Sequence, residues 1–156
     1  MNAESPKELD KHFMRQAIRE AEQAFAADEV PIGIVIVKDK KILARAHNQV
    51  ELLKDATAHA EMIALTQAAE ALGSVHLPNT TLYVTLEPCP MCLGAMILAR
   101  IGKLIFGARE EKTGACGSIV NLLNDGKWNH KFKIQEGLLE FESAALLQEF
   151  FKGKRH

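Results

Sequence analysis

TTLYVTLEPCPMC, residues 80–92, joins a β-strand to the beginning of a helix. Residues 80–86 are rich in threonine, valine and tyrosine, which is typical of a strand. Pro88 and Pro90 follow at once, and proline is tolerated in a first helical turn because the N–H groups there have no partner within the helix. The sequence therefore predicts a strand that leads directly into a helix ending near Arg100.

Helices and strands also alternate on both sides of this unit. Apolar residues recur every four positions from Leu9 to Phe25, which indicates one buried face of a helix. The other predicted elements are a hairpin of strands over 31–37 and 42–46, a loop over 47–57, a helix over 59–72, a strand over 103–106 ended by Gly107, a glycine-rich loop and a last helix over about 143–151. This order predicts an α/β fold, with helices on both faces of a mixed sheet of about five strands.

Length and composition indicate one soluble domain over residues 1–156. Hydrophobic residues make up 47% and charged residues 25% of the chain, which is ordinary for a globular protein. No apolar run approaches the roughly 18 residues that a membrane span needs, and the N-terminus lacks the apolar centre of a signal peptide. An odd number of cysteines argues against a disulfide framework. We therefore expect a cytoplasmic protein.

Two short segments carry the residues suited to chemistry, Thr57-Ala58-His59-Ala60-Glu61 and Glu87-Pro88-Cys89-Pro90-Met91-Cys92. Each lies where a helix is expected to begin. His59, Cys89 and Cys92 offer one imidazole and two thiols, a ligand set that suits zinc. Three protein ligands leave the fourth tetrahedral position for water, which is typical of a catalytic zinc site. Glu61 can point into the same pocket without binding the metal, and a carboxylate there can carry protons.

Each of these residues taken alone also has an ordinary interpretation. His59 could be a hydrogen-bonded structural histidine, Glu61 a solvated helix residue, and the two cysteines a redox pair or half of a structural zinc site. Cys116 is the only spare thiol that could close such a site, although a small apolar filler is its simpler interpretation. The joint spacing favours the catalytic zinc site.

The combination of H-A-E with P-C-x-x-C is the established signature of the cytidine/deoxycytidylate deaminase superfamily. From residue 29 to residue 151 the chain resembles the bacterial tRNA-specific adenosine deaminases more closely. The matching segments are residues 30–33, 47–48, 57–61, 82–89, 100–102, 112–115 and 129–130. The Lys-Thr-Gly-Ala and Asn-His segments distinguish that family from free-base deaminases.

The resemblance implies a three-layer α/β/α cytidine-deaminase-like fold and a homodimer with one zinc ion per subunit. His59, Cys89 and Cys92 would hold zinc, and Glu61 would be the catalytic proton shuttle. The substrate would be a tRNA anticodon stem-loop whose wobble adenosine becomes inosine. Asn48 would hydrogen-bond the flipped purine. Glu110 stands where the family usually has an aspartate that contacts the backbone of the anticodon loop.

The chain departs from the family pattern at two further positions, and two alternative functions remain open. Ala56 replaces the usual proline and Ile34 replaces a frequent alanine. A free-base or nucleoside deaminase would share the zinc site, and a binding protein with an inactive site is a third hypothesis, against which Glu61 argues. The net charge of -1 does not point to nucleic acid, but late basic residues could contact phosphates or simply be solvated: Lys127, Lys131, Lys133, Lys152, Lys154 and Arg155.

Overall fold

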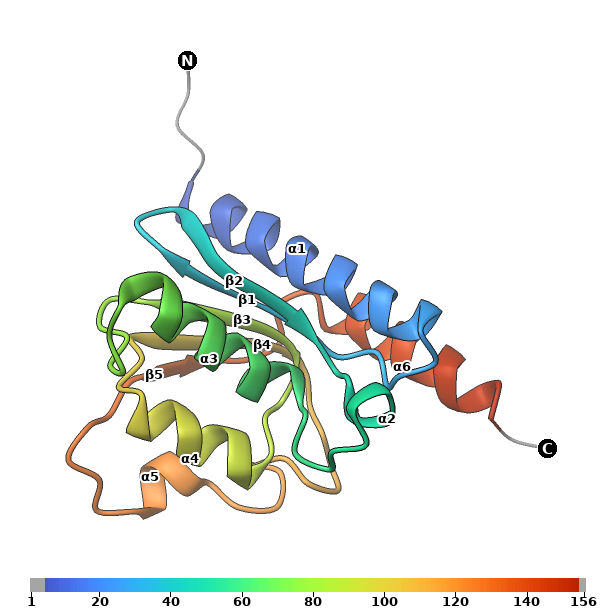
Figure 1. Ribbon diagram of the computed structural model, residues 1–156. Helices are drawn as coiled ribbons and strands as arrows, with labels where there is room; N and C mark the ends of the chain where they lie inside the picture. Colours follow the sequence, from blue (N-terminus) through green and yellow to red (C-terminus); the bar gives the residue numbers. More distant parts are fainter. Residues whose placement is uncertain (1–4, 155–156) are drawn as a thin grey trace.

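The computed structural model describes residues 5–154 and contains a five-stranded mixed sheet (Figure 1). The strands are β1 (Gly33–Lys38), β2 (Lys41–His47), β3 (Thr81–Leu86), β4 (Lys103–Ala108) and β5 (Lys133–Gln135), in the spatial order β2-β1-β3-β4-β5. β1 is antiparallel to both β2 and β3, whereas β3, β4 and β5 run parallel to one another. The predicted α/β fold with about five strands is confirmed.

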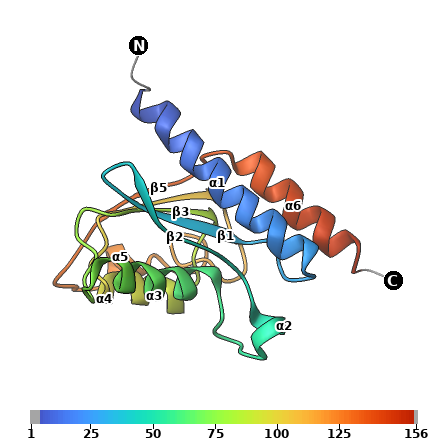
Figure 2. The same ribbon diagram turned by 45° about the horizontal axis from the view of Figure 1, so that its top comes forward.

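Helices cover both faces of this sheet, so the molecule has three layers (Figure 2). α1 (Pro6–Ala26) and α6 (Glu140–Lys152) lie side by side on one face. α3 (Ala60–Leu72), α4 (Pro90–Leu98) and the short α5 (Leu122–Asp125) lie on the other. Because side chains alternate along a strand, neighbouring residues of one strand enter different cores. Val35 packs under α1, and Ile34, which is fully buried, packs on the side of α3 and α4.

Close packing fixes α1 on the sheet. A Cβ at Gly33 would collide with the carbonyl oxygen of Ala17 and would lie 2.5 Å from the amide nitrogen of Ala21. Only glycine therefore allows the backbone of α1 to approach the beginning of β1 this closely. The Tyr83 hydroxyl donates a hydrogen bond to the Asp10 carboxylate at 2.6 Å, which connects α1 to the centre of the sheet as well.

Some predicted boundaries are wrong. The expected loop over 47–57 contains a short helix, α2 (Val50–Leu53), and α5 and β5 were not predicted. Gly107 does not end the fourth strand but lies within it, because α6 packs directly against this position. A Cβ at Gly107 would lie 2.8 Å from the Ser143 hydroxyl. The last helix also begins at Glu140 rather than near residue 143.

Within residues 5–154, no helix combines the length and the apolar character needed to cross a membrane.

Candidate functional site

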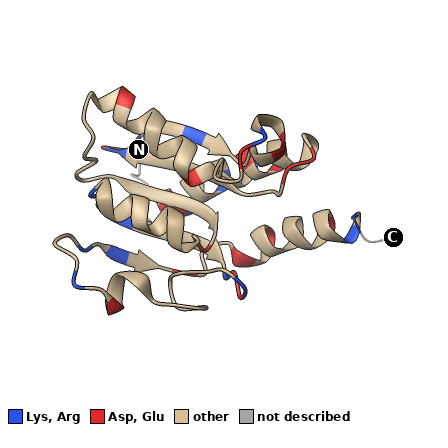
Figure 3. Cartoon of the chain, turned by 60° about the horizontal axis from the view of Figure 1, so that its bottom comes forward, with Lys and Arg blue, Asp and Glu red and all other residues tan. Residues whose placement is uncertain are grey.

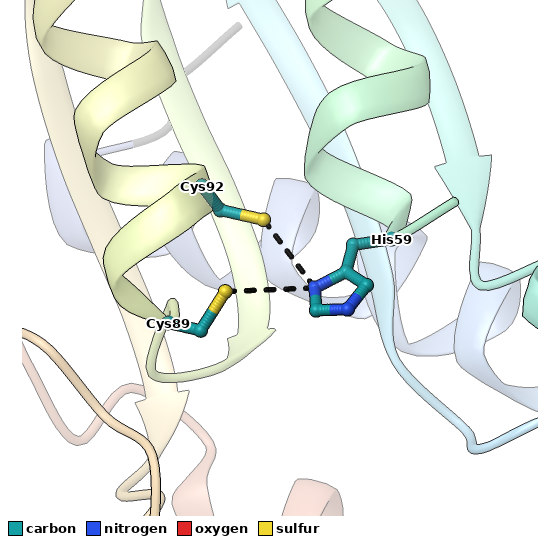
Figure 4. A group of neighbouring side chains, drawn as sticks. All are labelled: His59, Cys89 and Cys92. Carbon is teal, nitrogen blue, oxygen red and sulfur yellow. Dashed lines mark hydrogen bonds between the residues drawn. The ribbon is translucent and has the colours of Figure 1, made fainter. Parts of the chain in front are cut away.

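His59, Cys89 and Cys92 come together where two helices begin (Figure 4). His59 is the residue before α3, Cys89 is the residue before α4, and Cys92 lies in the first turn of α4. The Nδ1 atom of His59 is 3.6 Å from the Sγ atom of Cys89 and 3.5 Å from that of Cys92. The strand β3 leads into α4 as predicted, so the C-x-x-C spacing turns both sulfur atoms toward one ring nitrogen.

The donor set of this group fits a zinc ion. The three candidate ligand atoms all lie within 4.8 Å of one another. One imidazole nitrogen and two sulfur atoms suit a tetrahedral zinc site with an open position. Among residues 5–154 this is the only such group of histidine, cysteine or acidic residues, and it does not include Cys116. The closed four-ligand site with Cys116 is therefore not formed.

The pKa values of the two thiols are shifted in opposite directions. The pKa of Cys89 is lowered to about 4, first by a hydrogen bond with Cys92 and also by His59. The same hydrogen bond and burial raise the pKa of Cys92. The hydrogen bond with Cys89 raises the pKa of His59. Metal binding to such a group releases protons, because thiolate and neutral imidazole are the ligating forms.

Glu61 lies in the first turn of α3 with a side chain that is 3% exposed. Its Oε1 atom has no hydrogen-bond partner among the described residues. Burial raises the pKa of Glu61 to about 7. The charge of His59 lowers this pKa, and the charge of Cys89 raises it. A carboxyl group with a pKa near neutrality can accept and return a proton, which is what a general acid and base must do.

Asn48 connects a cavity to the beginning of α3. Its Oδ1 atom accepts a hydrogen bond of 2.8 Å from the backbone N–H of Ala60, the residue after His59. This contact orients the amide group, so that the NH₂ group is left as a donor. Asn48, His59 and Ala56 line a cavity of about 900 Å³, which is large enough for a nucleobase and its sugar.

Two side chains at this cavity make contacts that the sequence did not indicate. The Nδ1 atom of His47 lies 3.2 Å from the buried carboxylate of Glu20 on α1, and His47 lines the cavity beside Asn48. The carboxylate of Glu29 accepts hydrogen bonds from the backbone N–H groups of Glu51 and Leu52, at 2.9 and 2.7 Å. Glu29 thus holds α2 at the rim of the cavity. No local sequence signal indicates these contacts, because each joins residues more than 20 positions apart.

Glu110 lies outside the His59–Cys89–Cys92 group, in the segment that follows β4. We call residues 109–118 the 109–118 loop. Glu110 is partly exposed, and its Oε1 atom accepts a hydrogen bond of 3.0 Å from the backbone N–H of Lys112. Its own backbone N–H donates to the buried carboxylate of Glu87 at 3.0 Å. The side chain therefore contacts its own loop, and none of its hydrogen bonds reaches the His59–Cys89–Cys92 group.

The late basic residues are divided between the segments around β5 and the end of α6 (Figure 3). Lys154 lines the cavity, but its ammonium group pairs with Asp28 and lies 5.3 Å from the ring centre of Phe150. Lys127, Lys131 and Lys133 lie near β5 and are not among the residues that line this cavity. Arg155 lies outside the described residues.

Comparisons with known proteins identify the family. A family profile described as MafB19-like deaminase matches residues 8–155. The tRNA-specific adenosine deaminase of Bacillus subtilis is 46% identical over 146 residues, which cover 94% of this chain and 91% of that protein. The enzyme of the same name from Aquifex aeolicus is 47% identical, with coverage of 94% and 96%.

Solved structures agree with this assignment. A structure from work on A-to-I editing by tRNA:A34 deaminases at the wobble position of transfer RNA superimposes with a TM-score of 0.84 at 46% identity, and covers 87% of this chain and 99% of that one. The guanine deaminase of Nitrosomonas europaea, at 23% identity and a TM-score of 0.78, shares the fold, with coverage of 96% of this chain and 86% of that one. With its cytidine-deaminase-like fold and these relatives, the chain belongs to the family of tRNA-specific adenosine deaminases.

Proposed function

We propose that this protein converts adenosine to inosine by hydrolysis at the wobble position of a tRNA anticodon loop, with one zinc ion in each subunit. The observation that carries the proposal is the His59–Cys89–Cys92 group with the buried, unpaired carboxyl oxygen of Glu61 beside the same helix start. The relatives named above act on tRNA, which supports the choice of substrate.

His59, Cys89 and Cys92 would hold the zinc ion, which when bound supplies a hydroxide nucleophile by lowering the pKa of water to ~7. Glu61 takes the proton that the attacking water loses and delivers it to N1 of adenine as the C6–O bond forms. Glu61 then takes the remaining proton of the new C6 hydroxyl group and delivers it to the exocyclic nitrogen, the C6–N6 bond breaks and ammonia leaves. One water is consumed for each ammonia released, so atoms and charge balance without a further reactant.

Asn48 would orient the base. Its amide oxygen is used by Ala60, so its NH₂ group is the part that can contact an acceptor on the purine. The adenosine has to leave the anticodon-loop stack to enter the cavity that Asn48 lines, as expected for an enzyme that modifies a base within a nucleic acid. Glu110 would contact the backbone of the same RNA loop.

The remaining features of the proposal follow from family resemblance and composition. They are a single domain over residues 1–156, a homodimer, a cytoplasmic location, and phosphate contacts by late basic residues such as Lys154. Lys154 would have to exchange its Asp28 partner for a phosphate to make such a contact.

The test compares an anticodon stem-loop that carries adenosine at the wobble position with free adenosine, cytidine and guanine, and measures ammonia and inosine. We expect turnover of the stem-loop. A Glu61→Gln variant should keep its metal and lose turnover by about 10²- to 10⁴-fold, because a proton carrier contributes on this order. Ammonia from a free base with an untouched stem-loop would refute the tRNA substrate, and an active Glu61→Gln enzyme would refute the mechanism.

A further inference from the structure

The carboxylate of Glu87 is buried but belongs neither to the metal-binding group nor to the lining of the cavity. Glu87 follows β3 directly and precedes Cys89 by two residues. Its side chain is 2% exposed. A buried carboxylate of this kind has to be fully hydrogen-bonded, and the identity of its partners indicates what it does.

All four hydrogen-bond donors to the Glu87 carboxylate come from the 109–118 loop. The backbone N–H groups of Glu110, Cys116 and Ser118 donate at 3.0, 2.8 and 3.2 Å, and the Ser118 hydroxyl donates as well. The 109–118 loop therefore closes around one buried carboxylate.

Two further contacts fix the 109–118 loop against the start of α4. Gly114 passes so close to Glu87 that a Cβ at this position would collide with the carboxylate. The backbone N–H of Ala115 donates to the carbonyl of Pro88 at 2.8 Å, one residue before Cys89. The middle of the loop, residues 111–113, faces solvent. One side of the loop is thus anchored beside the metal-binding group, and the other side is free to meet a substrate.

We infer that Glu87 is a positioning residue for RNA binding: its carboxylate holds the 109–118 loop in the shape that receives the backbone of the anticodon loop. The inference rests on the proposed function. A loop that is ordered before binding loses little conformational entropy when RNA binds, whereas a loose loop has to be ordered at that moment. Glu87 therefore acts on binding of the stem-loop and leaves the chemical step to Glu61.

The experiment uses Glu87→Gln in the zinc-loaded, full-length protein and single-turnover kinetics on the anticodon stem-loop. We expect the half-saturating RNA concentration to rise about 10- to 100-fold, because a neutral amide accepts fewer hydrogen bonds and leaves buried donors unpaired. The maximal rate and the metal content should stay near those of the wild type. The matched control is Glu70→Gln, which changes an exposed glutamate on α3 and should alter none of these values.

Hydrogen exchange gives a readout that does not depend on activity. In Glu87→Gln the amides of Glu110, Cys116 and Ser118 should exchange faster, while those of β3 stay protected. Should Glu87→Gln fail to fold, Ser118→Ala tests the same contact more gently. It removes one donor, and we expect the half-saturating concentration to rise about 2- to 10-fold.

Several results would overturn the inference. One is unchanged half-saturation in Glu87→Gln, or in Ser118→Ala if that variant has to be used. Another is unchanged exchange in the 109–118 loop. A fall in maximal rate together with lost metal would show that Glu87 serves the metal-binding group instead. If the wild type itself leaves the stem-loop unmodified, the proposed function fails, and this result is distinct from the three above.

Discussion

Asn48 joins two roles that substitution can separate. Its amide oxygen accepts the N–H of Ala60 at the start of α3, while its NH₂ group is left for the purine. Asn48→Ala removes both functions. Asn48→Asp keeps an oxygen that can accept from Ala60 and removes the donor. The first variant should therefore lose stability and activity, and the second should lose mainly activity.

The magnitude follows from burial. Asn48 is 5% exposed and Ala60 is fully buried, so Asn48→Ala leaves the buried Ala60 N–H without its protein partner. Such a loss costs about 1–3 kcal/mol in the free energy of unfolding. For a domain of this size, that lowers the melting temperature by roughly 2–4 °C per kcal/mol. In Asn48→Asp, the negative charge lies at a helix N-terminus, where it is favoured, so the free energy of unfolding should stay within about 1 kcal/mol of the wild type.

The assay is urea unfolding of the zinc-loaded variants, followed by kcat/KM on the anticodon stem-loop. We expect kcat/KM of Asn48→Asp to fall by about 10- to 100-fold, the equivalent of one lost hydrogen bond in the transition state. Gln49→Ala is the control for stability, because no side-chain hydrogen bond of Gln49 caps α2. Equal unfolding of Asn48→Ala and wild type would refute the structural role, and a fully active Asn48→Asp would refute the role as a donor to the purine.

Cys92→Ser should lose bound zinc by metal analysis, whereas Cys116→Ser should keep it; equal loss in both would contradict the three-ligand site. Gly33→Ala should lower the free energy of unfolding by about 1–3 kcal/mol through collision with α1, whereas Gly94→Ala, with open space, should not. Burial and a hydrogen bond to α1 raise the pKa of Tyr83, so the folded chain keeps a proton that the unfolded chain releases, and stability should fall as the pH rises above ~10. Tyr83 is the only tyrosine, so tyrosinate absorbance that follows unfolding would confirm this, and titration of the folded protein at an ordinary pH would contradict it.

The His59–Cys89–Cys92 group was predictable because its geometry is local. Cys89 and Cys92 are one helical turn apart, and the helix that brings them together is marked by prolines and by the strand before it. Glu61 follows His59 by two residues, so a single helix start places both. The long helices and the central strands were predicted for the same reason, since their apolar periodicity is contained within each segment.

The elements that were missed depend on contacts between distant residues. α2 has only four residues, and its backbone is held by the Glu29 carboxylate from 22 and 23 positions away. Nothing within α2 indicates a helix, because a helix this short has little stability of its own. The 109–118 loop was predicted as a glycine-rich loop, but its hydrogen bonds to Glu87 across 23 to 31 positions were not. The buried carboxylates of Glu29 and Glu87 thus fix the structure of two segments whose local sequence indicates only a loop.

The position of the end of α6, where Lys154 pairs with Asp28, affects where another protein can be fused to this enzyme. The last turn of α6 packs against the end of α1, with Phe150 against Phe25, and both Phe150 and Lys154 line the cavity. A partner attached after α6 would stand beside this cavity, whose entrance the RNA uses under the proposed function. The first residue of α1 lies at the other end of a helix of 21 residues, about 30 Å away. Fusion before α1 therefore leaves the entrance clear, and immobilisation through that end presents the cavity to solution.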